Sequence, residues 1–387
     1  MTVQFSNYMP EVVATRRYLH QIPELGLSEF RTSDYVAEQL TAMGYDITRG
    51  LARTGIVASL KNGTSARTIG LRADFDALPI LEETGVEYAS TNAGVMHACG
   101  HDGHTAMLLG AAKILAERKN FDGTVHLIFQ PAEENFGGAN LMIEDGLFER
   151  FPCDAVFGLH NEPAIPFGHF AFREGPIMAS VDECRITVVG RGGHGAEPQV
   201  ASDPIVAGAS IIMALQTIVS RNIHPLKSAV VTVGAFNGGI ASNVIPERVA
   251  MDLTIRALDS DVRDELETRI CAIAEGQAAS YGMSVELKYD RGYPPTVNHK
   301  AETDYVRELA KRFAGEDKVY DMVHPTMGAE DFAYMLEKVP GTYFFLGTAK
   351  TEDDPPLHHP RYDFNDDILP IGTAFWVELV EDRLAAS

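Results

Sequence analysis

Short apolar strand patterns alternate with helical patterns over the first 160 residues of the chain. The strand patterns span residues 55–60, 67–73, 123–130 and 154–159, and the helical patterns span 9–21, 29–43, 104–118 and 138–148. Strands that alternate with helices form α/β sheets whose strands are largely parallel. Another helical pattern, at 301–314, resumes the alternation near the other end of the chain. We therefore predict an α/β fold with a largely parallel central sheet.

The pattern changes after residue 182. The segments that follow read as strand, helix, strand, strand, helix and strand, at 185–189, 203–221, 228–236, 247–257, 260–280 and 284–289. This order matches the ferredoxin-like βαββαβ unit. A chain of 387 residues is also too long for one typical core. We expect a catalytic domain built from 1–182 and 297–387, with a lid or dimerisation domain inserted at 183–296.

Charge and cysteine content narrow the partners and the compartment. Acidic residues outnumber basic residues by 54 to 32, which gives a net charge of −22 and disfavours nucleic acid and anionic membranes as partners. Four cysteines in so long a chain are typical of free thiols in a reducing compartment. The first residues lack the apolar stretch of a secretory signal, and the longest apolar run, near 205–219, falls short of a membrane span of ~20 residues. The prediction is a cytoplasmic protein.

Side chains of metal-ligand type follow three of the predicted strands. Asp74 and Asp76 follow the strand at 67–73, Glu133 and Glu134 follow the strand at 123–130, and His160 follows the strand at 154–159. Sites form at the carboxyl ends of parallel strands. Two adjacent carboxylates after a buried strand need compensating charge, which a metal supplies. One carboxylate can then bind metal while the other accepts a proton from water, although an isolated Glu-Glu pair is more often solvated.

The densest cluster of such residues runs from His97 to His104. It holds three of the thirteen histidines and one of the four cysteines within eight residues. In an extended chain alternate residues face the same side, so His97, Cys99 and His101 would point together. Imidazole and thiolate are good ligands for zinc and similar ions. The alternative is a solvent-exposed loop that carries these histidines by chance.

Three further polar residues have ordinary explanations when each is taken alone. His194 lies among glycines at 190–196, as at the tip of a hairpin, and Asn243 suits a turn. His358 reads as part of a surface turn.

Taken together, an ordered series of motifs resembles the M20 metallopeptidase family, and within it the amidohydrolase branch of hippurate hydrolases, N-acyl-amino-acid deacetylases and auxin-conjugate hydrolases. The resemblance covers nearly the whole chain. The segments that carry it are 17–20, 23–25, 71–79, 99–104, 130–134, 192–194, 243–246, 328–332 and 358–363. It implies a zinc-exopeptidase-like catalytic domain with two divalent metal ions, which would be Zn, Mn, Co or Ni.

The resemblance also implies a role for each ligand position. Cys99 would bridge the two metals as a thiolate. His101 and His160 would complete one metal site, and Glu134 and His358 would complete the other. Because Cys99 takes the bridging place, Asp74 is not expected to be a ligand.

The remaining roles implied by the resemblance concern catalysis. Glu133 would be the general base that activates water, and Asp76 would orient the ligands. His194 and Asn243 would come from the inserted domain to hold the oxyanion, within one subunit or across a homodimer interface. The predicted function is hydrolysis of the amide bond of small N-acyl amino acids, hippurate-like or N-acetyl.

Three other functions stay open at this point. The chain could be an amidase with Cys99 as nucleophile, a small dipeptidase or aminopeptidase of the same family, or a binding protein without turnover. The sequence leaves the acyl group and the amino acid undetermined.

Overall fold

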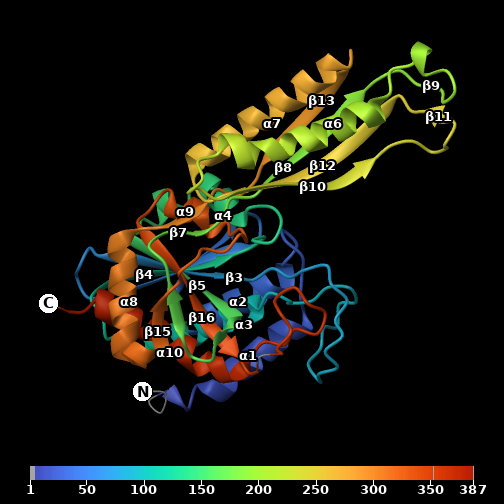
Figure 1. Cartoon of the computed structure of the whole chain (residues 1–387). Helices are drawn as coiled ribbons and strands as arrows, with labels where there is room; N and C mark the ends of the chain where they lie inside the picture. Colours follow the sequence, from blue (N-terminus) through green and yellow to red (C-terminus); the bar gives the residue numbers. More distant parts are fainter. Residues whose placement is uncertain (1–4, 352, 387) are drawn as a thin grey trace. The chain divides into compact units, whose positions relative to one another are not determined.

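The computed structural model describes residues 5–351 and 353–386, which form two compact units (Figure 1). Unit 1 consists of Met1–Gly175, Val297–His324 and Asp331–Ser387. Unit 2 consists of Pro176–Thr296 and Pro325–Glu330. Each unit has its own hydrophobic core.

Unit 1 is built on an eight-stranded sheet with the order β1-β2-β4-β3-β5-β16-β6-β15. Its strands are β1 (Asp46–Leu51), β2 (Gly55–Asn62), β3 (Thr68–Asp74), β4 (Gly123–Gln130), β5 (Ala155–Pro166), β6 (Phe170–Phe172), β15 (Val319–Asp321) and β16 (Gly341–Ala349). The four central strands, β4, β3, β5 and β16, are parallel to their neighbours in this group. Strands β1 and β2 extend the sheet in antiparallel fashion. The predicted largely parallel central sheet is therefore confirmed.

Helices cover both faces of this sheet (Figure 1). One face carries α1 (Met9–Gln21), α2 (Phe30–Ala42), α3 (His101–Arg118), α8 (Lys300–Ala314) and α10 (Leu369–Arg383). The other face carries α4 (Gly138–Glu144), α5 (Leu147–Arg150) and α9 (Phe332–Leu336). Helix α3 packs against α1, α10 and the central strands, and most of its residues are buried. Such a helix needs apolar and small residues all round, which explains its run of alanines and leucines.

Helix α3 begins at His101, three residues before the start expected at 104. The residue before it, Gly100, has a φ of +91°, a left-handed conformation that an L-residue rarely adopts. A Cβ atom on Gly100 would also lie 2.4 Å from the Asn161 Oδ1 atom. Glycine at this position lets the chain turn directly from Cys99 into the helix, so that His101 stands at the helix N-terminus.

Unit 2 contains a four-stranded antiparallel sheet with the order β10-β12-β8-β13. Its main elements are β8 (Asp182–Val189), α6 (Pro204–Thr217), β10 (Ala229–Asn237), β12 (Arg248–Ala257), α7 (Ser260–Ser280) and β13 (Ser284–Arg291). Helices α6 and α7 lie side by side on one face of the sheet (Figure 1). The predicted βαββαβ unit is confirmed. The remaining short elements are β7 (Gly175–Met178), β9 (Gly193–His194), η2 (Pro198–Val200), η3 (Ile218–Asn222), β11 (Val244–Ile245), β14 (Thr296–Asn298), η4 (Glu316–Lys318) and η5 (Asp366–Ile368).

One helical stretch, Pro204–Asn222, is long and apolar enough to cross a membrane by length and composition alone. A core helix of a folded domain passes the same test. Here Ala207, Ile211, Leu215 and Ile218 lie in the core of unit 2. The apolar composition of this stretch is thus partly explained by its packing against the sheet.

Unit 2 also contains a buried ion pair that joins three of its elements. The Asp182 carboxylate on β8 accepts hydrogen bonds from Arg263 Nη2 on α7 at 2.5 Å and from the Tyr289 hydroxyl on β13 at 3.0 Å. The Arg263 side chain is 9% exposed and that of Asp182 is fully buried. The pair therefore anchors α7 and β13 to the central strand.

We expect Asp182→Ala to destabilise unit 2 by about 3–5 kcal/mol, because it leaves the Arg263 guanidinium buried without its partner. Urea unfolding followed by circular dichroism measures the loss, and hydrogen exchange of peptides from α7 and β13 locates it. Asp252→Ala is the matched control, since the Asp252–Arg185 pair is largely exposed and should leave the unfolding midpoint unchanged. Equal midpoints for the two variants would contradict the anchoring role.

Candidate metal centre

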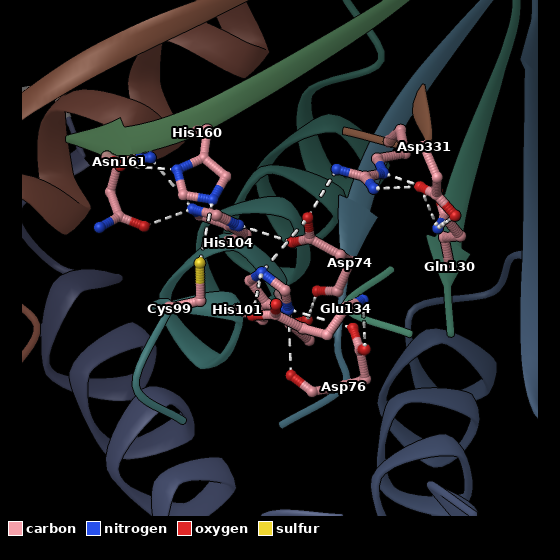
Figure 2. A network of polar contacts seen from close by, with 12 residues as sticks. Asp74, Asp76, Cys99, His101, His104, Gln130, Glu134, His160, Asn161 and Asp331 are labelled. Atoms are coloured by element: carbon pink, nitrogen blue, oxygen red, sulfur yellow. Dashed lines mark hydrogen bonds and ion pairs between the residues drawn. The ribbon is translucent and has the colours of Figure 1, made fainter. Parts of the chain in front are cut away.

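The predicted ligand residues lie close together beside the central strands of unit 1. Figure 2 shows four of them, Cys99, His101, Glu134 and His160. Strand β3 ends at Asp74, strand β4 leads into Glu133 and Glu134, and His160 lies within β5. Helix α3 supplies His101 from its first position. The parallel arrangement of β4, β3 and β5 brings these parts of the chain to one region.

The first donor group consists of Cys99, His101 and His160, whose ligand atoms lie within 4.8 Å of one another. The His101 Nδ1 atom lies 3.0 Å from the Asp76 carbonyl oxygen and 3.1 Å from its Oδ1 atom. The His160 Nδ1 atom lies 2.6 Å from the carbonyl oxygen of Asn161. Because these oxygens accept hydrogen bonds, each Nδ1 carries the proton and each Nε2 is left as a metal donor.

The second donor group consists of Cys99, Glu134 and His358, again within 4.8 Å. The His358 Nε2 atom lies 3.4 Å from Glu134 Oε1. His358 has a φ of +65°, a conformation that costs an L-residue roughly 1–2 kcal/mol. Its backbone N–H donates to the carbonyl oxygen of Ala98 at 2.8 Å, which fixes the strained residue beside Cys99. Cys99 is therefore common to both groups.

Glu133 lies next to both donor groups and is 7% exposed. Its carboxylate forms a third cluster with His101 and Glu134, within 4.8 Å. The turn that carries it is strained, because Ala132 has a φ of +54°. The backbone N–H of Glu134 donates to Asp76 Oδ2 at 2.9 Å. Asp76 thus contacts both His101 and the turn that holds the two glutamates.

Burial and neighbouring carboxylates act together on the Cys99 thiol. Burial raises its pKa well above the usual value, and the negative charges of Glu134 and Glu133 raise it further. A thiolate at this position therefore requires cations close to the sulfur.

The two histidines of the first donor group respond in opposite directions. Burial holds the pKa of His160 well below its usual value, and His104 lowers it further. Burial also lowers the pKa of His101, but Asp74 and Asp76 outweigh it and raise the pKa to about 10. The carboxylates around His101 thus attract positive charge.

Two buried atoms of the donor groups are available to contact a bound cation. His101 Nε2 and Glu134 Oε1 are buried and have no hydrogen-bond partner among the described residues. A thiol, carboxylates and imidazoles with free Nε2 atoms are the donors that divalent transition metals prefer. The residues of this centre therefore fit a pair of divalent cations.

Asp74 joins a hydrogen-bonded network to the donor groups (Figure 2). Its Oδ2 atom lies 3.7 Å from His101 Nε2, and Asp74, His101 and His104 form a further group of potential ligands within 4.8 Å of one another. The Asp74 Oδ2 atom also accepts from Arg72 Nη1 and the Oδ1 atom lies near His104 Nδ1, each at 2.6 Å. The other ring nitrogen of His104 lies 2.6 Å from Asn161 Oδ1. Both carboxylate oxygens of Asp74 are thus engaged by side chains, and the network connects Arg72 to Asn161.

The same network extends to the strand ends on its other side. Arg72 Nε donates to Gln130 Oε1 at 2.8 Å, and Gln130 Nε2 donates to Asp331 Oδ1 at 2.8 Å. His104, Asn161, Gln130 and Asp331 were not among the site residues predicted from the sequence. One signal was available, because a charged Arg72 within an apolar strand requires buried partners.

The structure corrects one expectation about the His97–His104 segment. His97 was expected to point with Cys99 and His101, but it belongs to none of the donor groups found in residues 5–351 and 353–386. It is buried, and burial lowers its pKa to about 4. The segment is not an extended strand, because helix α3 begins at His101 and turns that side chain away from the alternating pattern.

His194 and Asn243 lie in unit 2, where two short strands hold them together. Strand β9 ends at His194 and pairs with β11, where Val244 is opposite His194. The N–H of Gly195 donates to the Asn243 carbonyl oxygen at 2.7 Å. Both residues are exposed.

Comparisons with known proteins agree with this arrangement. Residues 70–382 match the model of Peptidase family M20/M25/M40. The hippurate hydrolase of Campylobacter jejuni is 43% identical over 96% of this chain and 98% of that protein. The N-acetyl-L-cysteine deacetylase of Bacillus subtilis is 42% identical over 97% of this chain and 89% of that protein. The crystal structure of B. subtilis YXEP, a dinuclear metal binding peptidase from the M20 family, is 33% identical, covers 99% of both chains and superposes with a TM-score of 0.86.

The fold and the donor groups are those of a metal-dependent hydrolase that acts on amide bonds. The chain belongs to peptidase family M20/M25/M40, in its amidohydrolase branch. This confirms the family resemblance that the sequence motifs carried.

We expect Cys99→Ala to weaken metal binding by more than about 100-fold, because the sulfur is the donor common to both groups and even outer contacts of a metal site are worth about 10–100-fold. Titration of metal-free protein with Zn²⁺ or Mn²⁺ by calorimetry measures the affinity and the stoichiometry. Cys153→Ala is the control, since this thiol lies in the same unit outside the donor groups. Unchanged binding of two ions by Cys99→Ala would contradict the bridging role.

Proposed function

We propose that the protein hydrolyses the amide bond of small N-acyl amino acids, hippurate-like or N-acetyl. The observation that carries this proposal is a sulfur shared by two donor groups with the Glu133 carboxylate directly beside them. Support also comes from relatives named for hydrolysis of hippurate and deacetylation of N-acetyl-L-cysteine. A dipeptidase or aminopeptidase activity of the same family remains the second candidate.

In this proposal the centre holds two divalent ions. Cys99 would be the ligand shared by both ions, His101 and His160 would hold one ion, and Glu134 and His358 would hold the other. When bound, the ions act as Lewis acids that polarise the scissile carbonyl and acidify water. Because Zn, Mn, Co and Ni accept such mixed ligands, the donor set does not select among them.

The chain's own residues supply the proton transfers and the orientation. Glu133 accepts a proton from the attacking water and later delivers it to the leaving amine. Asp76 orients His101 through Nδ1 and holds the Glu134 backbone, which is the outer contact that metal ligands need.

Unit 2 has a separate role in the proposal. His194 and Asn243 would donate hydrogen bonds to the developing oxyanion, where one donor typically contributes ~10²–10³ in rate. Unit 2 would act as a lid or as the interface of a homodimer. The protein would act in the cytoplasm on a small molecule, without nucleic acid or membrane as partner.

The alternative with Cys99 as nucleophile is disfavoured by its surroundings. A nucleophilic cysteine needs a lowered pKa. Cys99 lies just before the N-terminus of α3, which would favour a thiolate. Burial and the two glutamates raise the pKa of the Cys99 thiol instead.

We expect Glu133→Gln to lower kcat by roughly 10²–10⁴-fold, because the amide cannot accept the proton of the attacking water. The assay is a screen of N-benzoyl, N-acetyl and longer N-acyl amino acids against metal-free protein supplemented with Zn, Mn, Co or Ni. Metal content of the variant serves as control and should match that of the wild type. Wild-type activity in Glu133→Gln would rule out the assigned base.

Chelation should abolish hydrolysis, and added metal should restore it, because the ions supply the Lewis acid. The measurement is the rate before chelation, after removal of the chelator and metal by dialysis, and after readdition of each ion. A cysteine amidase would keep its activity throughout. Cys99→Ser extends the comparison, since a hydroxyl ligand retains weak turnover only if the centre works through metal.

A further inference from the structure

We propose that Glu29 is a positioning residue for Glu133, which it fixes by binding the backbone of the turn that carries the base. This inference rests on the proposed function, because Glu133 is the assigned proton acceptor. Glu29 directly precedes helix α2 and is completely buried. A buried carboxylate persists only where its oxygens are bound, so its partners indicate what it does.

Those partners connect Glu29 to the turn after β4. Its Oε1 atom accepts a hydrogen bond from the Ala132 backbone N–H at 2.9 Å. Its Oε2 atom accepts from the Thr54 hydroxyl at 2.7 Å. This N–H belongs to the peptide between Pro131 and Ala132, so Glu29 holds the backbone on the N-terminal side of the base, at the residue before Glu133.

The turn needs such a hold because its conformation is strained and crowded. Ala132 has a φ of +54°, which an L-residue adopts only where the surroundings enforce it. The backbone of Gly138 lies against the same turn, and a Cβ atom there would lie 1.7 Å from the Pro131 carbonyl oxygen. Loss of the bond from Glu29 would free the peptide to relax toward an ordinary conformation and would redirect Glu133.

The other side of the base is held in the same manner. The Glu134 backbone N–H donates to Asp76 Oδ2 at 2.9 Å. Carboxylates therefore bind the backbone on both sides of Glu133, with Glu29 at the Ala132 N–H and Asp76 at the Glu134 N–H. Asp76 also contacts His101, whereas the side-chain hydrogen bonds of Glu29 to other described residues go to the turn and to Thr54.

Capping of helix α2 does not account for Glu29, because its side chain makes no capping hydrogen bond. That role belongs to Glu24 on the same loop. Its Oε2 atom accepts from the Thr32 N–H at 2.9 Å, and its Oε1 atom accepts from the Arg31 N–H at 3.2 Å. Glu24 is therefore a matched control, since it is a glutamate of the same loop whose side-chain hydrogen bonds, among the described residues, go to the first turn of α2.

The test compares Glu29→Met, Glu29→Gln and Glu24→Ala at saturating metal on the best substrate of the screen. Methionine keeps the side-chain volume but removes both acceptors, so kcat should fall by about 10–100-fold with KM within about twofold. Glutamine should restore most of kcat, because its carbonyl oxygen can accept from Ala132 N–H while the Thr54 hydroxyl reverses its role. Glu24→Ala should lower the melting temperature without changing kcat.

A double variant separates positioning from general destabilisation. If Glu29 acts through Glu133, Glu29→Met should lower kcat no further in the Glu133→Gln background than Glu133→Gln does alone. Full additivity of the two losses would overturn the inference, as would a wild-type kcat in Glu29→Met. If Glu29→Met fails to fold, Glu29→Asp replaces it, because its shortened side chain cannot reach both Thr54 and Ala132, and a wild-type kcat there counts against the inference.

Hydrogen exchange of the peptide that spans 129–138 provides a readout that needs no turnover. Exchange should accelerate in Glu29→Met but not in Glu24→Ala. If exchange is faster in Glu29→Met but Glu133→Gln is fully active, Glu29 does stabilise the turn and Glu133 is not the base. Unchanged exchange in Glu29→Met would reject the hold itself.

Discussion

Carboxylates buried together near the ends of the central strands repel one another, and they oppose ionisation of a neighbouring thiol, unless cations lie among them. Cys99, Glu133 and Glu134 meet under these conditions, and burial with the two glutamates raises the pKa of the thiol. The same carboxylates would bind divalent ions strongly, because little water reaches the buried site to compete with them for the ions. Burial of these acidic groups is unfavourable without compensating positive charge, and the same need for positive charge makes the cluster suitable as a metal centre.

Hydrogen bonds from neighbouring residues fix the orientation of the candidate metal ligands. Asp76 and the Asn161 carbonyl bind the Nδ1 atoms of His101 and His160. This leaves the His160 Nε2 atom 3.5 Å from the Cys99 sulfur and the His101 Nε2 atom 4.0 Å from Glu134 Oε1. The backbone is also strained at two residues of the centre, since Ala132, next to Glu133, and the candidate ligand His358 both have positive φ values. Strain of this kind persists only where surrounding contacts enforce it, so the outer network carries part of the function.

Unit 2 has a hydrophobic core of its own and carries two exposed polar residues of the proposed site. Its sheet and two helices form an independent core, and the buried Asp182–Arg263 pair ties its last helix and strand to β8. Its exposed tip holds His194 and Asn243 together through two short strands. A rigid scaffold that presents two polar residues on an exposed tip suits the proposed contribution to an oxyanion site.

The sequence by itself determined the elements and the donor types. The helices expected at 9–21 and 260–280 appear as α1 (Met9–Gln21) and α7 (Ser260–Ser280), because periodicity and turn residues act locally. Ordered motifs also identified the family. Strand β16 and helix α10 were not foreseen, and the helix expected at 138–148 divides into α4 and α5.

Tertiary structure alone decided which side chains meet. It excluded His97 from the donor groups, joined His104 to Asn161 and brought Glu29 to Ala132 across 103 residues of sequence. These outcomes depend on the strand order and on the start of α3, which are set by pairing between distant segments. No local sequence pattern encodes the pairing of distant segments. That pairing depends on which charged side chains become buried together, and this happens only when the chain has folded.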